Sequence, residues 1–98
     1  MKRARLSFSY WSVRYPPDGI PNYVLRYRFN GKAWHNRLFD ADEVNLLNTA
    51  ILPAAIAPVV DIPLADLVQG TNTLEFVAVN IPQGYPPGVG NIDLILTP

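Results

Sequence analysis

The chain has 98 residues, of which 49% are apolar and 16% are charged, and it contains no cysteine. A chain of this length forms a single domain, residues 1–98, and its apolar content predicts a packed core and excludes disorder. The lack of cysteine excludes disulfides and thiolate metal sites but does not fix the compartment. No apolar stretch is long enough to span a bilayer, and no apolar segment follows the basic N-terminus, so we expect neither a membrane anchor nor a signal peptide.

The net charge is zero, but the charges are distributed unevenly. All eight lysines and arginines precede residue 38, whereas seven of the eight acids follow it. A basic face for an anionic ligand would give this asymmetry, and so would two halves of one domain whose charges compensate. We predict compensation, because a nucleic-acid-binding domain usually carries a basic net charge. Nucleic acid is therefore not an expected partner.

Residues Arg5–Val13 alternate as a half-buried strand does. Leu6, Phe8 and Tyr10 share one face, and three polar or amphipathic residues, the last of them Trp11, share the other. This pattern predicts a strand whose apolar face lies in the core. It also predicts that the indole of Trp11 is exposed.

Residues Tyr23–Phe39 predict a hairpin, because Asn30-Gly31 supplies the two positive φ angles of a type I′ turn. The register that follows from this turn places Tyr27 opposite Trp34 and Arg26 opposite His35. One face of the hairpin is then apolar and collects Tyr23, Leu25, Tyr27, Phe29, Trp34 and Leu38. The other face is basic, and we expect it to meet water or an acidic partner; it collects Arg26, Arg28, His35 and Arg37.

Two helical segments are expected in the second half of the chain. Asp40 as N-cap and Glu43 three residues later favour a short helix over residues 40–52, which Pro53 should end. Residues Pro63–Gln69 predict one or two helical turns, because proline suits the first helical position and Gly70 suits the cap.

Three further strands complete the predicted set. They are Pro58–Ile62, Thr73–Asn80 and a last strand that contains Ile92, Leu94 and Leu96. In the middle one, Leu74, Phe76 and Ala78 share one face. Residues 15–22 and 81–90, rich in proline and glycine, read as loops. Six or seven strands with one or two short helices are typical of an all-β fold, an antiparallel, jelly-roll-like sandwich.

Three segments, taken in order, resemble galactose-binding-like jelly-roll domains. They are the Asn30-Gly31 hairpin, the stretch DIPLADLVQGTNTLEF at residues 61–76, and the closing strand Asn91–Leu96. The similarity extends over about Tyr23 to Thr97. It implies a β-sandwich that binds carbohydrate without catalysis. Members of that group often hold calcium in N-terminal strands that have no obvious counterpart here, so no calcium ligand is assigned.

The sequence offers few groups for chemistry. The chain has one histidine, no cysteine, and serines outside any nucleophile-elbow context, so we expect no enzyme activity and no cofactor. We interpret His35 as a solvated structural side chain. Asp40, Asp42 and Glu43 suit a helix N-terminus without any metal, so no metal site is expected.

Binding groups are better supplied. Aromatic rings in loops and on exposed strand faces can lie against the apolar face of a sugar while amides bind its hydroxyls. The leading hypothesis is therefore a carbohydrate-binding accessory module of a larger secreted or surface protein. Its candidate ligand residues are Trp11, Tyr15, Asn22, Tyr85 and Asn91.

A second hypothesis is a structural or assembly module. An open strand edge, together with the basic face, would dock a partner protein or a second copy, so a homo-oligomer is a candidate state. A third hypothesis, binding of a polyanion through the same basic face, has less support because the net charge is zero.

Overall fold

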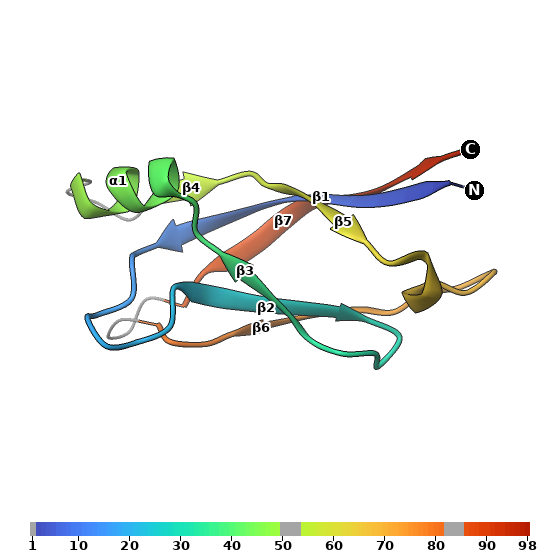
Figure 1. Cartoon of the computed structure of the whole chain (residues 1–98), viewed down its shortest axis with the longest axis horizontal. Coiled ribbons are helices and arrows are strands. Elements are labelled where there is room, and N and C mark those ends of the chain that lie inside the picture. The colour runs from blue at the N-terminus through green and yellow to red at the C-terminus, as the bar shows by residue number, and fades with distance from the viewer. Residues whose placement is uncertain (1, 50–53, 82–85) are drawn as a thin grey trace.

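The computed structural model describes residues 2–49, 54–81 and 86–98. Two antiparallel sheets pack face to face, and one helix lies at one end of them (Figure 1). The predicted all-β sandwich is therefore confirmed. The N- and C-terminal segments lie side by side at the opposite end, where the Lys2 amide donates to the Thr97 carbonyl at 2.9 Å.

The first sheet is organised around its longest strand, β1 (Arg3–Val13). Strand β7 (Gly88–Thr97) pairs with β1 along one side. Two short strands, β4 (Ala54–Ile56) and β5 (Val59–Ile62), pair one after the other with its other side. Strand β1 is therefore the one element that holds this sheet together.

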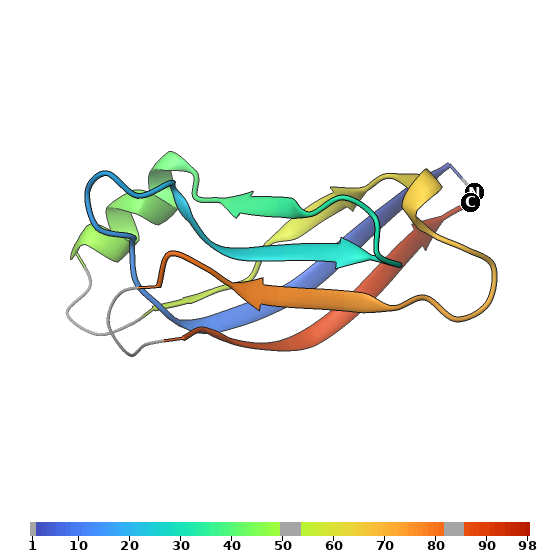
Figure 2. The ribbon, with the colours of Figure 1, turned by 90° about the horizontal axis from the view of Figure 1, so that it is seen from below.

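The second sheet has β2 (Tyr23–Phe29) in the middle. Its neighbours are β3 (His35–Leu38) and β6 (Leu74–Ala78). Figure 2 shows that the strands of the two sheets cross obliquely and that β6 and β7 lie on the same side of the sandwich.

The core is built on the inward row of β1. Ala4, Leu6, Phe8, Tyr10 and Val13 are all buried, which confirms the predicted alternation. The Phe8 ring lies 5.1 Å from the ring of Phe76 in the opposite sheet, measured between centroids. Pairs of rings at this separation add attraction beyond the burial of their area. This row therefore joins the two sheets.

The predicted hairpin forms, but the predicted register of its two strands is wrong by one residue. Asn30 and Gly31 have the expected positive φ angles, and the Lys32 amide donates to the Phe29 carbonyl at 2.9 Å. Tyr27, however, lies opposite His35 and not opposite Trp34. The returning arm holds one extra residue before β3 begins, and a shift by one residue exchanges the two faces.

A second irregularity lies in β2. Between Tyr23 and Arg26 the pairing with β3 shifts back by one residue, so β2 carries the extra residue here. Val24 and Leu25 are both buried as a result. Leu38 pairs with Tyr23 as predicted but is exposed, so its assignment to the apolar core face is wrong.

The predicted helix and its cap are present. Helix α1 (Ala41–Thr49) follows Asp40, whose carboxylate accepts from the Glu43 amide at 2.8 Å. The Glu43 carboxylate accepts in return from the Asp40 amide at 3.0 Å. These two bonds form the capping box that the sequence predicted. The predicted end of the helix at Pro53 lies outside the described residues.

The predicted helical segment after Pro63 is shorter than expected. Only η1 (Leu64–Asp66) forms, a single 3₁₀ turn, and Leu67 is already extended. Gly70 has the expected positive φ of 96°. The Asn72 side chain accepts from the Val68 amide at 2.8 Å and so holds the turn in place of further helix.

Candidate functional site

Opposite charges in the two halves of the chain pair with one another, as predicted from the charge asymmetry. Three ion pairs join basic residues before residue 38 to acids after it, at 2.6 to 2.9 Å: Arg3 with Asp61, Arg28 with Glu75, and Arg37 with Glu43. The His35 ring also lies within hydrogen-bonding distance of the Asp66 carboxylate, at 3.2 Å. The hydrogen bond from Arg3 holds the pKa of the Asp61 carboxyl below its ordinary value. The uneven distribution of charge thus stabilises contacts within the domain.

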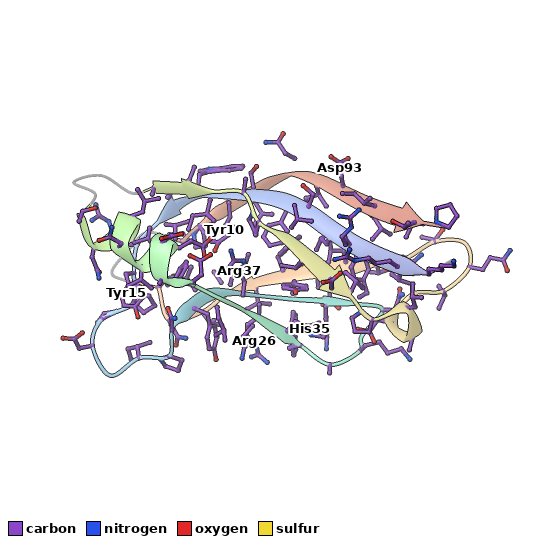
Figure 3. The ribbon with its side chains drawn as sticks, turned by 45° about the horizontal axis from the view of Figure 1, so that its top comes forward. Tyr10, Tyr15, Arg26, His35, Arg37 and Asp93 are labelled. Atoms are coloured by element: carbon purple, nitrogen blue, oxygen red, sulfur yellow. The ribbon has the colours of Figure 1, made fainter. Side chains whose placement is uncertain are left out.

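The predicted basic face is divided between two sides of the second sheet. Arg26 and Arg28 lie over the Trp34 ring, with their guanidinium carbons 5.3 and 4.2 Å from its centroid. His35 instead lies against Tyr27 on the inner side, with 5.4 Å between ring centroids, and Arg37 also points inward (Figure 3). The four residues therefore do not form one face, because the hairpin register differs from the predicted one.

A cleft of about 530 Å³ lies between β3 and β5. Arg37 and Glu43 line it, and their side chains are only 12% and 14% exposed. One Glu43 oxygen accepts from Arg37 and the other accepts from the Asp40 amide, so both oxygens are occupied. The Tyr10 side chain lies near this pair, and burial raises the pKa of its phenol. The charged groups of the cleft thus bind one another.

Tyr15 and Asn22, two of the predicted ligand residues, both contact Phe39. The Tyr15 ring lies 5.8 Å from the Phe39 ring between centroids, and the Asn22 side chain donates to the Phe39 carbonyl at 3.0 Å. These contacts join the first loop to the segment that leads into α1. Tyr85, a third predicted ligand residue, lies outside the described residues.

Trp11 and Asn91 lie together on the outer side of the first sheet. Trp11 is 45% exposed, as predicted, and its indole covers two glycines of the neighbouring strand. A Cβ atom at Gly88 would lie 2.5 Å from the indole, and one at Gly90 would lie 3.1 Å from it. The Asn91 side chain donates to the Ser9 hydroxyl at 3.5 Å. The predicted ligand residues therefore divide between two places.

The predicted start of the last strand is wrong. Residues 88–90 were predicted to lie in a proline- and glycine-rich loop, whereas β7 begins at Gly88. Glycine suits these positions because a larger residue would occupy the space of the Trp11 ring. In the sequence, Gly88 and Gly90 suggest a loop, whereas in the structure they leave room for the Trp11 ring.

Strand β7 is the longest open edge in the part of the chain that the structure describes. Its ten residues pair with β1 only. The other edges are shorter: β3 has four residues, β6 has five, and Pro58 interrupts the edge of β4 and β5. A long unpaired edge presents backbone donors and acceptors that another strand can engage.

Both faces of this edge strand expose apolar side chains. Leu94 and Leu96 lie opposite the buried Leu6 and Ala4 on the inner side. Ile95 lies opposite Arg5 on the outer side. The exposed fractions of Ile92, Leu94, Ile95 and Leu96 are 36 to 47%. The strand itself was predicted from the sequence, but its exposure was not, since apolar residues on both faces of a strand are more typical of the interior.

Two kinds of site are not found in the described ranges. No group of three or more histidine or acidic side chains there is placed to hold a metal ion. None of the described helices has the length and apolar character needed to cross a membrane.

Comparison with protein-family models, curated proteins and solved structures finds no match to this chain. The described residues form a small β-sandwich in which β7 pairs with β1 on one side, has no strand on its other side, and exposes apolar side chains. The resemblance to galactose-binding-like domains stays a prediction.

We predict that Gly88→Ala destabilises the domain by about 1–3 kcal/mol, because the new methyl group overlaps the Trp11 indole. In a Trp11→Ala background the same change should be neutral or stabilising, since the space is then free and alanine restricts the unfolded chain. Urea unfolding of the four proteins measures the coupling. An equal cost in both backgrounds would show that the ring does not rest on Gly88.

Proposed function

We propose that this domain is a non-catalytic assembly module that binds an extended strand of another chain along the edge of β7. The observation that carries the proposal is the ten-residue edge of β7, with apolar side chains exposed on both faces. A strand added there would form main-chain hydrogen bonds with the edge and would cover side chains on both faces of the sheet. Main-chain bonds supply affinity, and the side chains select the partner.

The edge of β7 lacks most of the features that usually prevent pairing. Natural edge strands are short, or carry lysine, proline or bulges. Between Gly88 and Thr97 there is no lysine or proline, and Asp93 is the one charge. A bulge occurs at Asn91, which has a positive φ of 50°, and from Asp93 to Thr97 the strand pairs regularly with β1. This regular stretch, together with Ile92 just before it, is therefore the part of the edge that fits a partner strand.

Selection from a phage-displayed library of random peptides tests this function. The protein is immobilised at low density so that its copies do not pair with one another. We expect the enriched peptides to bind as extended strands at β7. Their affinity should fall at least about tenfold for Leu94→Lys, because a charge then replaces an apolar contact at the edge. Val77→Lys is the matched control, since Val77 is similarly exposed on the other edge strand, β6.

Two results would contradict the function. One is the absence of any enriched peptide. The other is equal binding to wild type and Leu94→Lys when circular dichroism shows that the variant is folded.

A second candidate function is carbohydrate binding on the outer side of the first sheet. The observation in its favour is the 45% exposed indole of Trp11, which glycines support from the neighbouring strand. Asn91 and Ser9 lie beside it and offer an amide and a hydroxyl. A supported, exposed ring with polar neighbours suits the stacking of a sugar.

For this second function we predict that saccharides identified on a glycan array change the tryptophan fluorescence of the protein. The change should disappear in Trp11→Ala and persist in Trp34→Ala, because Trp34 lies beneath Arg26 and Arg28 on the other sheet. Calorimetric titration gives the affinity. An array without any binding, or a signal that survives Trp11→Ala, would remove carbohydrate recognition at this place.

A further inference from the structure

We infer that the strand bound at β7 is the β7 strand of a second copy of this chain, paired antiparallel about a two-fold axis at Leu94. The inference rests on the proposed function, because it names the partner for the same edge. It is supported by the symmetry of the exposed side chains, the position of the bulge, and the charges on the outer side.

A two-fold axis limits the possible registers. Two identical antiparallel strands related by such an axis place one residue opposite its own copy. Regular pairing with β1 runs from Asp93 to Thr97, and Asn91 and Ile92 lie within the register shift before it. An axis at Leu94 pairs residues 92–96 and so includes four of the five regularly paired residues.

The inner side of this pairing is apolar throughout. Leu94 faces Leu94 of the second copy, and Ile92 faces Leu96 of that copy. All three side chains are substantially exposed in the single chain, with exposed fractions of 36 to 47%. The pairing therefore removes apolar surface from water on both copies, which is the main favourable contribution to most protein association.

The outer side adds complementary charge. Asp93 faces Ile95 of the second copy, and within that copy Ile95 is already opposite Arg5. The Cα atoms of Asp93 and of Arg5 in the other copy are then about 10 Å apart, two strand spacings. Asp93 makes no ion pair within the described part of its own chain. Because of the two-fold axis, each Asp93 carboxylate has an Arg5 guanidinium of the other copy in its neighbourhood.

Neighbouring registers are less favourable. An axis at Asp93 would place two carboxylates directly opposite one another, which is destabilising. An axis at Ile92 would bring the bulged Asn91 into the pairing and would place Gly90 opposite Leu94. An axis at Ile95 would leave Ile92 beyond the end of the paired segment.

Cysteine cross-linking tests the register, because the chain contains no cysteine of its own. Under mild oxidation Leu94→Cys should form a covalent dimer in high yield, since facing residues in an antiparallel pair have Cα atoms about 4.5–5.5 Å apart. Leu96→Cys is the matched control with similar exposure. Its copies would lie four residues out of register, about 13 Å apart, and should cross-link poorly.

A second variant protects the test against a folding defect at Leu94. The double variant Ile92→Cys with Leu96→Cys should form a dimer with two disulfides, because residue 92 faces residue 96 of the second copy. Sedimentation equilibrium of the wild-type chain should show a dimer that Leu94→Lys disrupts and Val77→Lys preserves.

The outcomes separate this inference from the proposed function. A monomeric wild type, or equal cross-linking at positions 94 and 96, overturns pairing with a second copy at Leu94. If selected peptides still bind at β7 in that case, the strand-binding function stands with a different partner. If no peptide binds either, both proposals fail.

Discussion

The fold depends on the packing of the inward row of β1 against the second sheet. Ala4, Leu6, Phe8, Tyr10 and Val13 are all buried, and β1 provides the pairing surface for every other strand of its sheet. The ring of Phe8 reaches across to Phe76 of the opposite sheet. A small domain buries a limited share of its surface, so one such row contributes a large part of the available stabilisation.

This arrangement makes the two sides of the first sheet unequal. On one side, β4 and β5 are short, and the break between them at Pro58 adjoins the cleft closed by the Arg37–Glu43 pair. On the other side, β7 runs along most of β1, and no other strand of the described ranges lies beyond it. The side with an interrupted edge thus adjoins an ion pair within the chain, whereas the other side presents the longer edge of β7. This difference supports the proposal that β7 accepts an added strand.

Local chemistry made several elements predictable from the sequence. The alternation in β1, the Asn30-Gly31 turn, the Asp40–Glu43 capping box and the left-handed Gly70 all depend on neighbours in the chain. The compensation between the basic and acidic segments was also predicted, because a net charge of zero favours it over a basic face for an anionic ligand.

The errors arise where distant residues decide the structure. One extra residue before His35 places Trp34 and His35 on the opposite faces of the sheet from those predicted. The residues of the turn give no sequence signal of this bulge. Gly88 and Gly90 read as loop residues, although they lie in a strand beneath Trp11. The last strand was predicted without its place in the sheet, because the sequence does not reveal that β7 lies at an edge.

Amide hydrogen exchange, followed residue by residue at low and high protein concentration, tests the account most directly. In dilute solution the amides of β1 should exchange slowest, and those amides of β7 that face away from β1 should exchange rapidly. At high concentration the outward amides of residues 92–97 should become protected, while the amides of β6 remain unchanged. Slow exchange of the outward β7 amides in dilute, monomeric protein would contradict the open edge on which the account depends.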